Sequence, residues 1–157
     1  MIKKPQFPIQ QIVYRLAEKQ HAKSATRNLQ SSAAAVKTEH SNGPVLAAYR
    51  SYKQYRCLKT SDYKISLSTG NNCILTTDGS PSLIKNILTD DDSIVLICQH
   101  FATACDAFSY PLQSSRLGMY NVSHRMTDLV LLPLCSVAQK CVLLPLMEGY
   151  VVFLLLH

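Results

Sequence analysis

The residues best suited to chemistry are six cysteines, at positions 57, 73, 98, 105, 135 and 141. The densest group of metal-ligating side chains is Cys98, His100 and Cys105, three soft ligands close together in the sequence. A structural zinc site needs four ligands, usually as two closely spaced pairs, and no Cys-x-x-Cys pair is present. We therefore predict no metal centre, and we interpret Cys98 and Cys105 as small buried hydrophobes. The N-terminal lysines are not followed by the apolar stretch of a secretory signal, so we expect reduced thiols.

The carboxylates and hydroxyls form no catalytic motif either. Asp90, Asp91 and Asp92 are consecutive and lack the ligand spacing of a calcium loop, which indicates a solvated turn. The sequence contains no Gly-x-Ser-x-Gly, no phosphate-binding Gly-x4-Gly-Lys loop and no His-Glu-x-x-His. We therefore predict a protein that is not an enzyme and that carries no cofactor.

Charge is the next informative feature, because it is unevenly divided along the chain. Residues 1–64 contain 12 Lys or Arg and three acids, whereas residues 65–157 contain four Lys or Arg and seven acids. A basic half of this kind predicts an anionic partner, such as nucleic acid, anionic lipid or an import machinery. The alternative is that the two halves attract each other in the folded protein.

The first basic segment has the periodicity of an amphipathic helix over residues 9–23. Its apolar side chains share one face, while Arg15, Lys19 and Lys23 follow one another at i, i+4 and i+8. The next residues, 24–37, are rich in serine and alanine and contain no acid, so residues 1–37 together have the composition of a mitochondrial transit peptide. An ordinary surface helix is the alternative. We assign residues 1–40 to this basic arm and expect an intracellular protein, mitochondrial or membrane-associated.

The second basic segment, residues 45–59, also has helical spacing. Tyr49 and Tyr52 alternate there with Arg50, Lys53 and Arg56. Aromatic rings that alternate with cations can stack on bases and neutralise phosphates, so the segment is a candidate surface for nucleic acid. Tyrosines that cover the edge of a core are the alternative.

Beyond residue 61 the hydrophobic period shortens towards that of strands. Residues 63–67 and 73–77 predict a β-hairpin around the turn at Thr69 to Asn72. A short helix is expected over residues 80–88, since Ser80 and Pro81 suit its cap and first position. An apolar strand follows at residues 93–98. Residues 41–128 thus predict a small α+β domain.

The C-terminal segment, residues 129–157, is the most apolar part of the chain, with 16 Leu, Val or Phe among 29 residues. The string Val-Leu-Leu-Pro-Leu occurs at residues 130–134 and again at 142–146. Three interpretations are open: a marginal membrane segment, core strands separated by a turn at Glu148 and Gly149, or an aggregation-prone tail. Residues expected to contact a membrane or partner are Leu143, Leu144, Val151, Val152, Phe153, Leu154 and Leu155.

Together these patterns predict an α+β chain with a helical, basic first third, a strand-rich middle and an apolar end. We expect a non-enzymatic accessory or interaction protein attached to a membrane or partner by its C-terminal segment. A nucleic-acid-binding module that uses the Tyr-rich basic helix is the alternative from another class. A chain under little selection to fold is the third.

Overall fold

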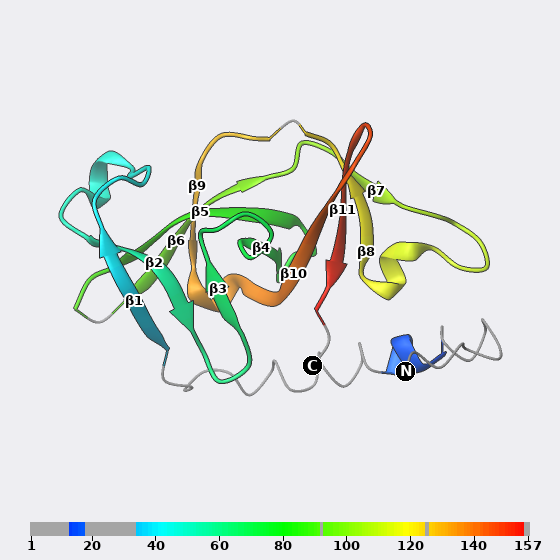
Figure 1. Cartoon of the computed structure of the whole chain (residues 1–157), viewed down its shortest axis with the longest axis horizontal. Helices are drawn as coiled ribbons and strands as arrows, with labels where there is room; N and C mark the ends of the chain where they lie inside the picture. Colours follow the sequence, from blue (N-terminus) through cyan, green and yellow to red (C-terminus); the bar gives the residue numbers. More distant parts are fainter. Residues whose placement is uncertain (1–12, 18–33, 92, 125, 156–157) are drawn as a thin grey trace.

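A computed structural model of the 157-residue chain describes residues 13–17, 34–91, 93–124 and 126–155 (Figure 1). Strands dominate these residues. In chain order they are β1 (Ala35–His40), β2 (Lys53–Lys59), β3 (Lys64–Ser66), β4 (Cys73–Thr76), β5 (Pro81–Thr89), β6 (Ile94–His100), β7 (Ala104–Asp106), β8 (Met119–Val122), β9 (Val130–Pro133), β10 (Val137–Leu146) and β11 (Gly149–Leu154). Three 3₁₀ turns, η1 (Ala47–Tyr49), η2 (Ser114–Leu117) and η3 (Leu134–Ser136), connect some of them.

Eleven strands of the described chain form one sheet in which every pairing is antiparallel. The main path runs β1-β2-β5-β4-β10-β11-β8-β7, with β3 added to β2 and with β6 joining β5 to β9. The predicted α+β class with a helical first third is therefore wrong.

Strand β4 explains how one sheet makes a core, because all four of its residues are buried. Ile74 belongs to a cluster with Leu58, Ile65 and other side chains of β2, β3, β5 and β6. Its neighbours Cys73 and Leu75 point the other way and belong to a second cluster, formed with β8, β10 and β11. A strand buried on both faces is a continuous apolar run, which is how residues 73–75 read in the sequence.

Strand β5 shows why a helix was wrongly predicted over residues 80–88. The register of β5 with β6 shifts between Ile84 and Asn86, so Lys85 is an inserted residue of a β-bulge. The bulge reverses the alternation, and Ile84 and Ile87 consequently enter the same core cluster. A spacing of three is typical of a helical face, so the bulged strand has the sequence signature of a helix.

Other local predictions fail because long-range pairing decides the outcome. Residues 45–59 form the turn η1 and strand β2 instead of a helix, and β2 pairs with β1, β3 and β5. The strands expected at 63–67 and 73–77 exist as β3 and β4, but β3 pairs with β2, and β4 pairs with β5 and β10. The apolar strand expected at 93–98 is confirmed as β6.

The predicted amphipathic helix is described only at residues 13–17, which are helical. Val13, placed by the prediction on the apolar face, is 57% exposed. Its neighbour Arg15 lies in this turn of helix, whereas Lys19 and Lys23 lie outside the described residues. The prediction that an amphipathic helix organises the first third of the chain is wrong, because the described residues from Ala35 onward form a sheet.

The apolar C-terminal segment supplies β9, β10 and β11, and β10 lies between β4 and β11 in the sheet. The segment forms strands instead of a single apolar helix, and Cys141, Val152 and Leu154 help to build the second core cluster of this β-rich fold. None of the helical stretches in the described residues has the length and apolar character needed to cross a bilayer. The alternative of core strands separated by a turn is the one that the structure confirms.

Candidate interaction site

The hairpin formed by β10 and β11 divides the apolar C-terminal residues between two faces. Leu143 pairs with Val152 and Cys141 with Leu154, and these four side chains pack in or against the second core cluster. The intervening residues face outward, because side chains alternate along a strand. Val142 pairs there with Phe153, and Leu144 with Val151. Of the predicted contact residues, Leu144, Val151 and Phe153 therefore lie on the outer face, as does Leu155 just beyond β11, and none of these four is fully buried.

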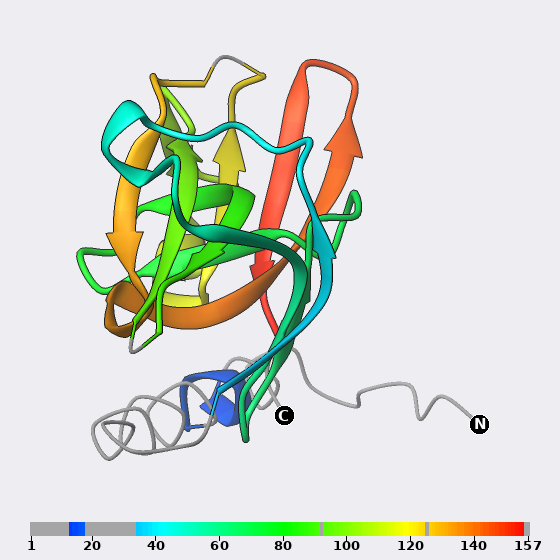
Figure 2. The same cartoon turned by 90° about the vertical axis from the view of Figure 1, so that its left-hand side faces the viewer.

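The tip of this hairpin, residues 144–148, contains Met147, the most exposed large hydrophobic side chain among the described residues. Leu144 is 48% exposed, Leu146 is 52% exposed and Met147 is fully exposed at 101%. Strand β4 pairs with β10 only as far as Cys141, so the tip half of β10 has β11 as its single neighbour. Figures 1 and 2 show this turn at the end of the molecule opposite the β2–β3 turn.

The turn itself is unfavourable for a hairpin. Leu146 pairs with Gly149, which leaves Met147 and Glu148 as a two-residue connection. Such connections favour turns with a positive φ at one or both residues, usually Asn-Gly, because these match the twist of the strands. Of the described non-glycine residues only Thr38 has a positive φ, so Met147 and Glu148 form neither favoured type. Local turn preference does not explain an exposed methionine here.

Gly149 fixes the hairpin tip against β8. A Cβ atom at this position would lie 2.5 Å from the backbone oxygen of Val122, a distance that real Cβ atoms essentially never show. The adjacent Tyr150 pairs with Val122 and packs edge-on to His124, with ring centroids 4.5 Å apart. The turn is therefore held rigidly at its base while its apolar side chains remain in solvent.

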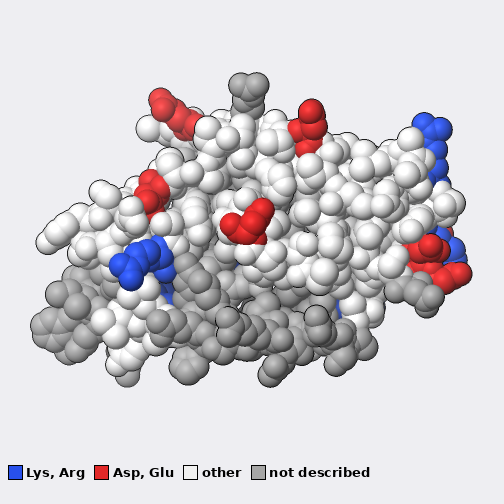
Figure 3. All heavy atoms as spheres, turned by 180° about the vertical axis from the view of Figure 1, so that it is seen from behind, with Lys and Arg blue, Asp and Glu red and all other residues white. Residues whose placement is uncertain are grey.

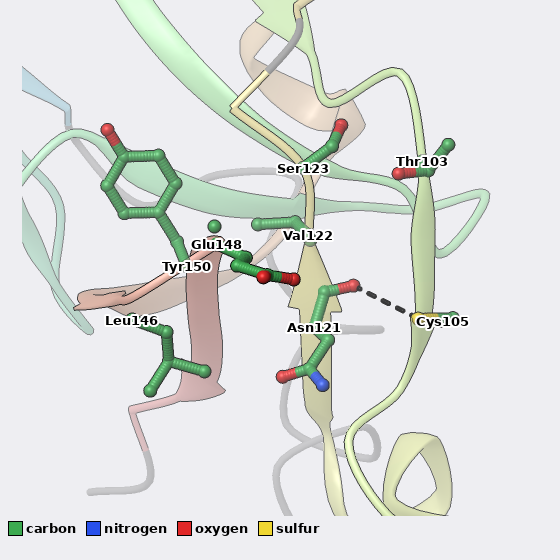
Figure 4. A pocket seen from close by; sticks show the side chains of 9 residues that line it. Thr103, Cys105, Asn121, Val122, Ser123, Leu146, Glu148 and Tyr150 are labelled. Carbon is green, nitrogen blue, oxygen red and sulfur yellow. Dashed lines mark hydrogen bonds between the residues drawn. The ribbon is translucent and has the colours of Figure 1, made fainter.

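A pocket of about 300 Å³ lies beside the tip, between the turn and the strands β7 and β8 (Figure 4). Leu146 and Glu148 line it from the hairpin, and Cys105, Asn121 and Ser123 line it from the other side. In Figure 4 the carboxylate of Glu148 points towards the backbone of β8 at Asn121. The Cys105 thiol lies 3.7 Å from the backbone oxygen of Asn121, to which it donates a hydrogen bond.

The polar side chains of this pocket include both acceptors and donors. Glu148 supplies a carboxylate, whereas Thr103, Ser123 and Cys105 carry hydroxyl or thiol hydrogens. The Oδ1 atom of Asn121 is buried without a hydrogen-bond partner, and in Figure 4 this side chain points away from the Glu148 carboxylate. The Glu148 carboxylate therefore suits a donor group placed next to the apolar side chain of Leu146.

Two buried cysteine thiols, one in the hairpin and one in the neighbouring strand β4, lie side by side at the base of the hairpin. Cys141 of β10 lies directly opposite Cys73 of β4, and both are fully buried. The hydrogen bond with Cys73, together with burial, raises the pKa of Cys141 well above its ordinary value. Burial likewise raises the pKa of the Cys98 thiol in β6 to about 12. High pKa values leave the thiols of Cys141 and Cys98 unreactive, whereas Cys105 is exposed.

The predicted anion-contact residues do not form one basic helix edge. Tyr49 and Tyr52 touch edge-to-face, with centroids 5.0 Å apart, in and after η1, and Arg50 follows η1 in the same turn. Lys53 and Arg56 are exposed on β2 but three positions apart, so strand alternation directs them to opposite faces. The back of the molecule shows a mostly uncharged described surface, on which acids and a few Lys or Arg side chains are scattered (Figure 3).

Sequence reasoning missed the residues that define the site, namely Leu146, Met147 and Glu148. The turn signal at Glu148 and Gly149 was visible, but only the register shows which apolar residues lie outward. Cys98 and Cys105 prove to be different, one buried in the core and one exposed at the pocket. Within the described residues, no three His, Cys, Asp or Glu side chains come together as a metal site.

Residues 39–155 match the family model described as Domain of unknown function (DUF8592), so the chain belongs to this family. The match covers most of the chain and begins within β1 and ends just after β11. Neither the curated proteins nor the solved structures include a match to this sequence.

Proposed function

We propose that this protein is a protein-interaction module that inserts the tip of its β10–β11 hairpin into an apolar pocket of a partner. The observation that carries the proposal is the exposure of Leu144, Leu146 and Met147 on a turn whose residues are poor choices for folding. Features that oppose local stability are expected at functional sites. Methionine is also frequent at binding surfaces, because its flexible thioether adapts to irregular pockets.

The pocket beside the tip specifies the chemistry of the partner further. The Glu148 carboxylate favours hydrogen-bond donors, such as an amide N–H, a lysine or an arginine. Pro145 lies in the tip half of β10, which has β11 as its single neighbour, and it has no N–H to give to a partner strand on the other edge. Docking through side chains is therefore favoured over extension of the sheet.

The test is site-specific photocrosslinking in cells that express the full chain. A p-benzoylphenylalanine at Leu146 should give a discrete adduct, and the same group at Thr69, an exposed turn residue far along the chain, should not. Leu144→Asp and Met147→Asp should abolish the adduct while the protein remains folded, because both positions are exposed. With the purified partner, Met147→Ala should weaken binding by about 1–2 kcal/mol, or roughly 5–30-fold.

Three outcomes would contradict the proposal. One is the absence of an adduct at Leu146, and another is the same adduct from Thr69. The third is undiminished crosslinking in both aspartate variants. An adduct of twice the chain mass would identify a second copy of this protein as the partner.

A further inference from the structure

A separate hollow of about 340 Å³ lies at the other end of the molecule, beside the turn that joins β2 to β3. Three lysines line it, Lys59 from β2, Lys64 from β3 and Lys140 from β10, together with the single acid Asp62. The side chains around the hollow therefore carry an excess of positive charge. Lys59 and Lys64 are close in the sequence, whereas Lys140 is far from both and is brought beside the turn by the sheet.

The pairing of Lys59 with Lys64 is the unusual feature of this hollow. They are directly opposite in the antiparallel register, so their side chains project from the same face with Cβ atoms about 5 Å apart. Like charges in this position destabilise a sheet. Among the described residues neither lysine forms an ion pair that would offset the repulsion. A bound anion between the two ammonium groups would convert that repulsion into attraction.

The turn beside the hollow is closed by hydrogen bonds, and Lys140 keeps donors for a ligand. The backbone N–H groups of Asp62 and Tyr63 donate to Thr60 Oγ1, at 3.3 and 3.1 Å, which fixes the turn. Lys140 donates from Nζ to Asn71 Oδ1 at 3.3 Å, which positions its ammonium and leaves further N–H donors available. Burial, with a smaller contribution from Asp62, raises the pKa of Tyr63 to about 12, so its hydroxyl stays protonated.

We propose that this hollow binds the phosphate group of a small phosphorylated molecule, with Lys59, Lys64 and Lys140 as its contacts. Lysine acts as a compact, mobile point charge that binds phosphate without the planar geometry of arginine. The volume lies at the lower end of the range for small-molecule sites, which fits a compact phosphate ester or a diphosphate. The site is independent of the hairpin tip and does not rest on the proposed interaction function.

Isothermal titration calorimetry of the full chain with inorganic pyrophosphate tests the site, with sodium chloride at equal ionic strength as the reference. Lys64→Gln and the double variant Lys59→Gln/Lys64→Gln should weaken binding by about tenfold or more, since charge-assisted contacts are lost. Lys85→Gln is the matched control, because it removes the same charge from β5, outside the hollow. It should change the affinity by less than about twofold.

Thermal unfolding supplies a second readout that a purely structural role would not give. Without ligand, Lys64→Gln should raise the midpoint at low salt, because the repulsion with Lys59 is removed. With pyrophosphate, the wild-type midpoint should rise and that of Lys64→Gln should stay unchanged.

The proposal is overturned if sodium chloride raises the midpoint as much as pyrophosphate, or if Lys85→Gln and Lys64→Gln lose affinity equally. It is also overturned if single-stranded oligothymidylate binds more than tenfold tighter than pyrophosphate and Lys85→Gln weakens that binding. This last result would indicate an extended nucleic-acid surface instead of a site for a small phosphorylated molecule.

Discussion

Two hairpins of the same sheet, β2–β3 and β10–β11, end in opposite ways. The β2–β3 turn is polar and is closed by hydrogen bonds of Thr60, whereas the β10–β11 turn exposes Leu146 and Met147. Both hairpins have a fully buried residue at their base, Ile65 in β3 and Val152 in β11. The core therefore determines where each hairpin stands, and the turns are free to differ.

This difference separates residues that fold the protein from residues that we assign to binding. The lysines opposite each other in β2–β3 and the apolar turn of β10–β11 both oppose local stability. Each is tolerated because the strands beneath it are anchored in a core cluster. Four predictions follow the comparison from the bases of the hairpins to their turns.

The largest expected effect is at the bases. Ile65→Asp and Val152→Asp each place a carboxylate at a fully buried position with no partner, and both should lose more than about 4 kcal/mol of unfolding free energy. Their outward neighbours, Lys64→Asp and Val151→Asp, should change it by less than about 1 kcal/mol. Urea denaturation followed by circular dichroism measures all four. Equal losses for Val151→Asp and Val152→Asp would refute the assignment of faces to β11.

The second effect is confined to the β2–β3 turn and depends on pH. The pKa of Tyr63 is raised from 10.0 to about 12, chiefly by burial, so the folded protein favours the neutral phenol. The resulting stability is complete below pH 10 and is lost as the pH rises towards 12, by about 1–3 kcal/mol.

Tyr63→Phe is the control, since it keeps every lysine and removes only the titrating hydroxyl. The variant should lose less stability between pH 9 and pH 12 in urea denaturation. Tyr120, whose pKa burial also raises, accounts for part of the remaining loss. An identical alkaline loss in wild type and Tyr63→Phe would show that Tyr63 does not contribute.

The third prediction concerns the hydroxyl that closes the same turn. Thr60 Oγ1 donates to the backbone oxygen of Tyr63 at 3.2 Å and accepts from two backbone N–H groups. Thr60→Val keeps the shape but leaves those donors unpaired, which should cost about 1–2 kcal/mol. Thr60→Ser retains the hydroxyl and should cost less. A serine variant as unstable as the valine variant would argue against this role of the hydrogen bonds.

The sequence predicts some parts of this fold well and others poorly, for reasons visible in single strands. The apolar run of β6 and the turn at Glu148 and Gly149 are local signals, and both appear in the structure. Strand β5 was mistaken for a helix because its bulge at Lys85 gives Ile84 and Ile87 helical spacing. Strand β2 was mistaken because its pairing with three other strands overrides a weak helical pattern.

The candidate site was only half predictable for a related reason. An apolar C-terminal segment was evident, but its division into core and outer faces depends on register. A one-residue shift of β11 would exchange Val152 for Val151 in the core. The lysine hollow was hidden as well, because Lys140 comes from a strand far along the chain from Lys59 and Lys64. The distribution of charge along the sequence identified the basic half of the chain, but it could not show that these three lysines come together in the fold.

The smallest expected effect is at the β10–β11 turn and has the opposite sign. Replacing Met147 and Glu148 by Asn-Gly supplies the positive φ angles that a two-residue connection favours, so the unfolding free energy should rise by about 0.5–1 kcal/mol. The same variant removes the exposed methionine and the pocket carboxylate, so crosslinking from Leu146 should disappear. Urea denaturation and the photocrosslinking assay, run on the same protein, measure the two changes. A more stable protein that no longer crosslinks would show that Met147 and Glu148 serve binding at the expense of folding. A gain in stability with crosslinking intact would remove the turn from the binding site, and a loss of stability would show that these two residues are needed for the hairpin itself.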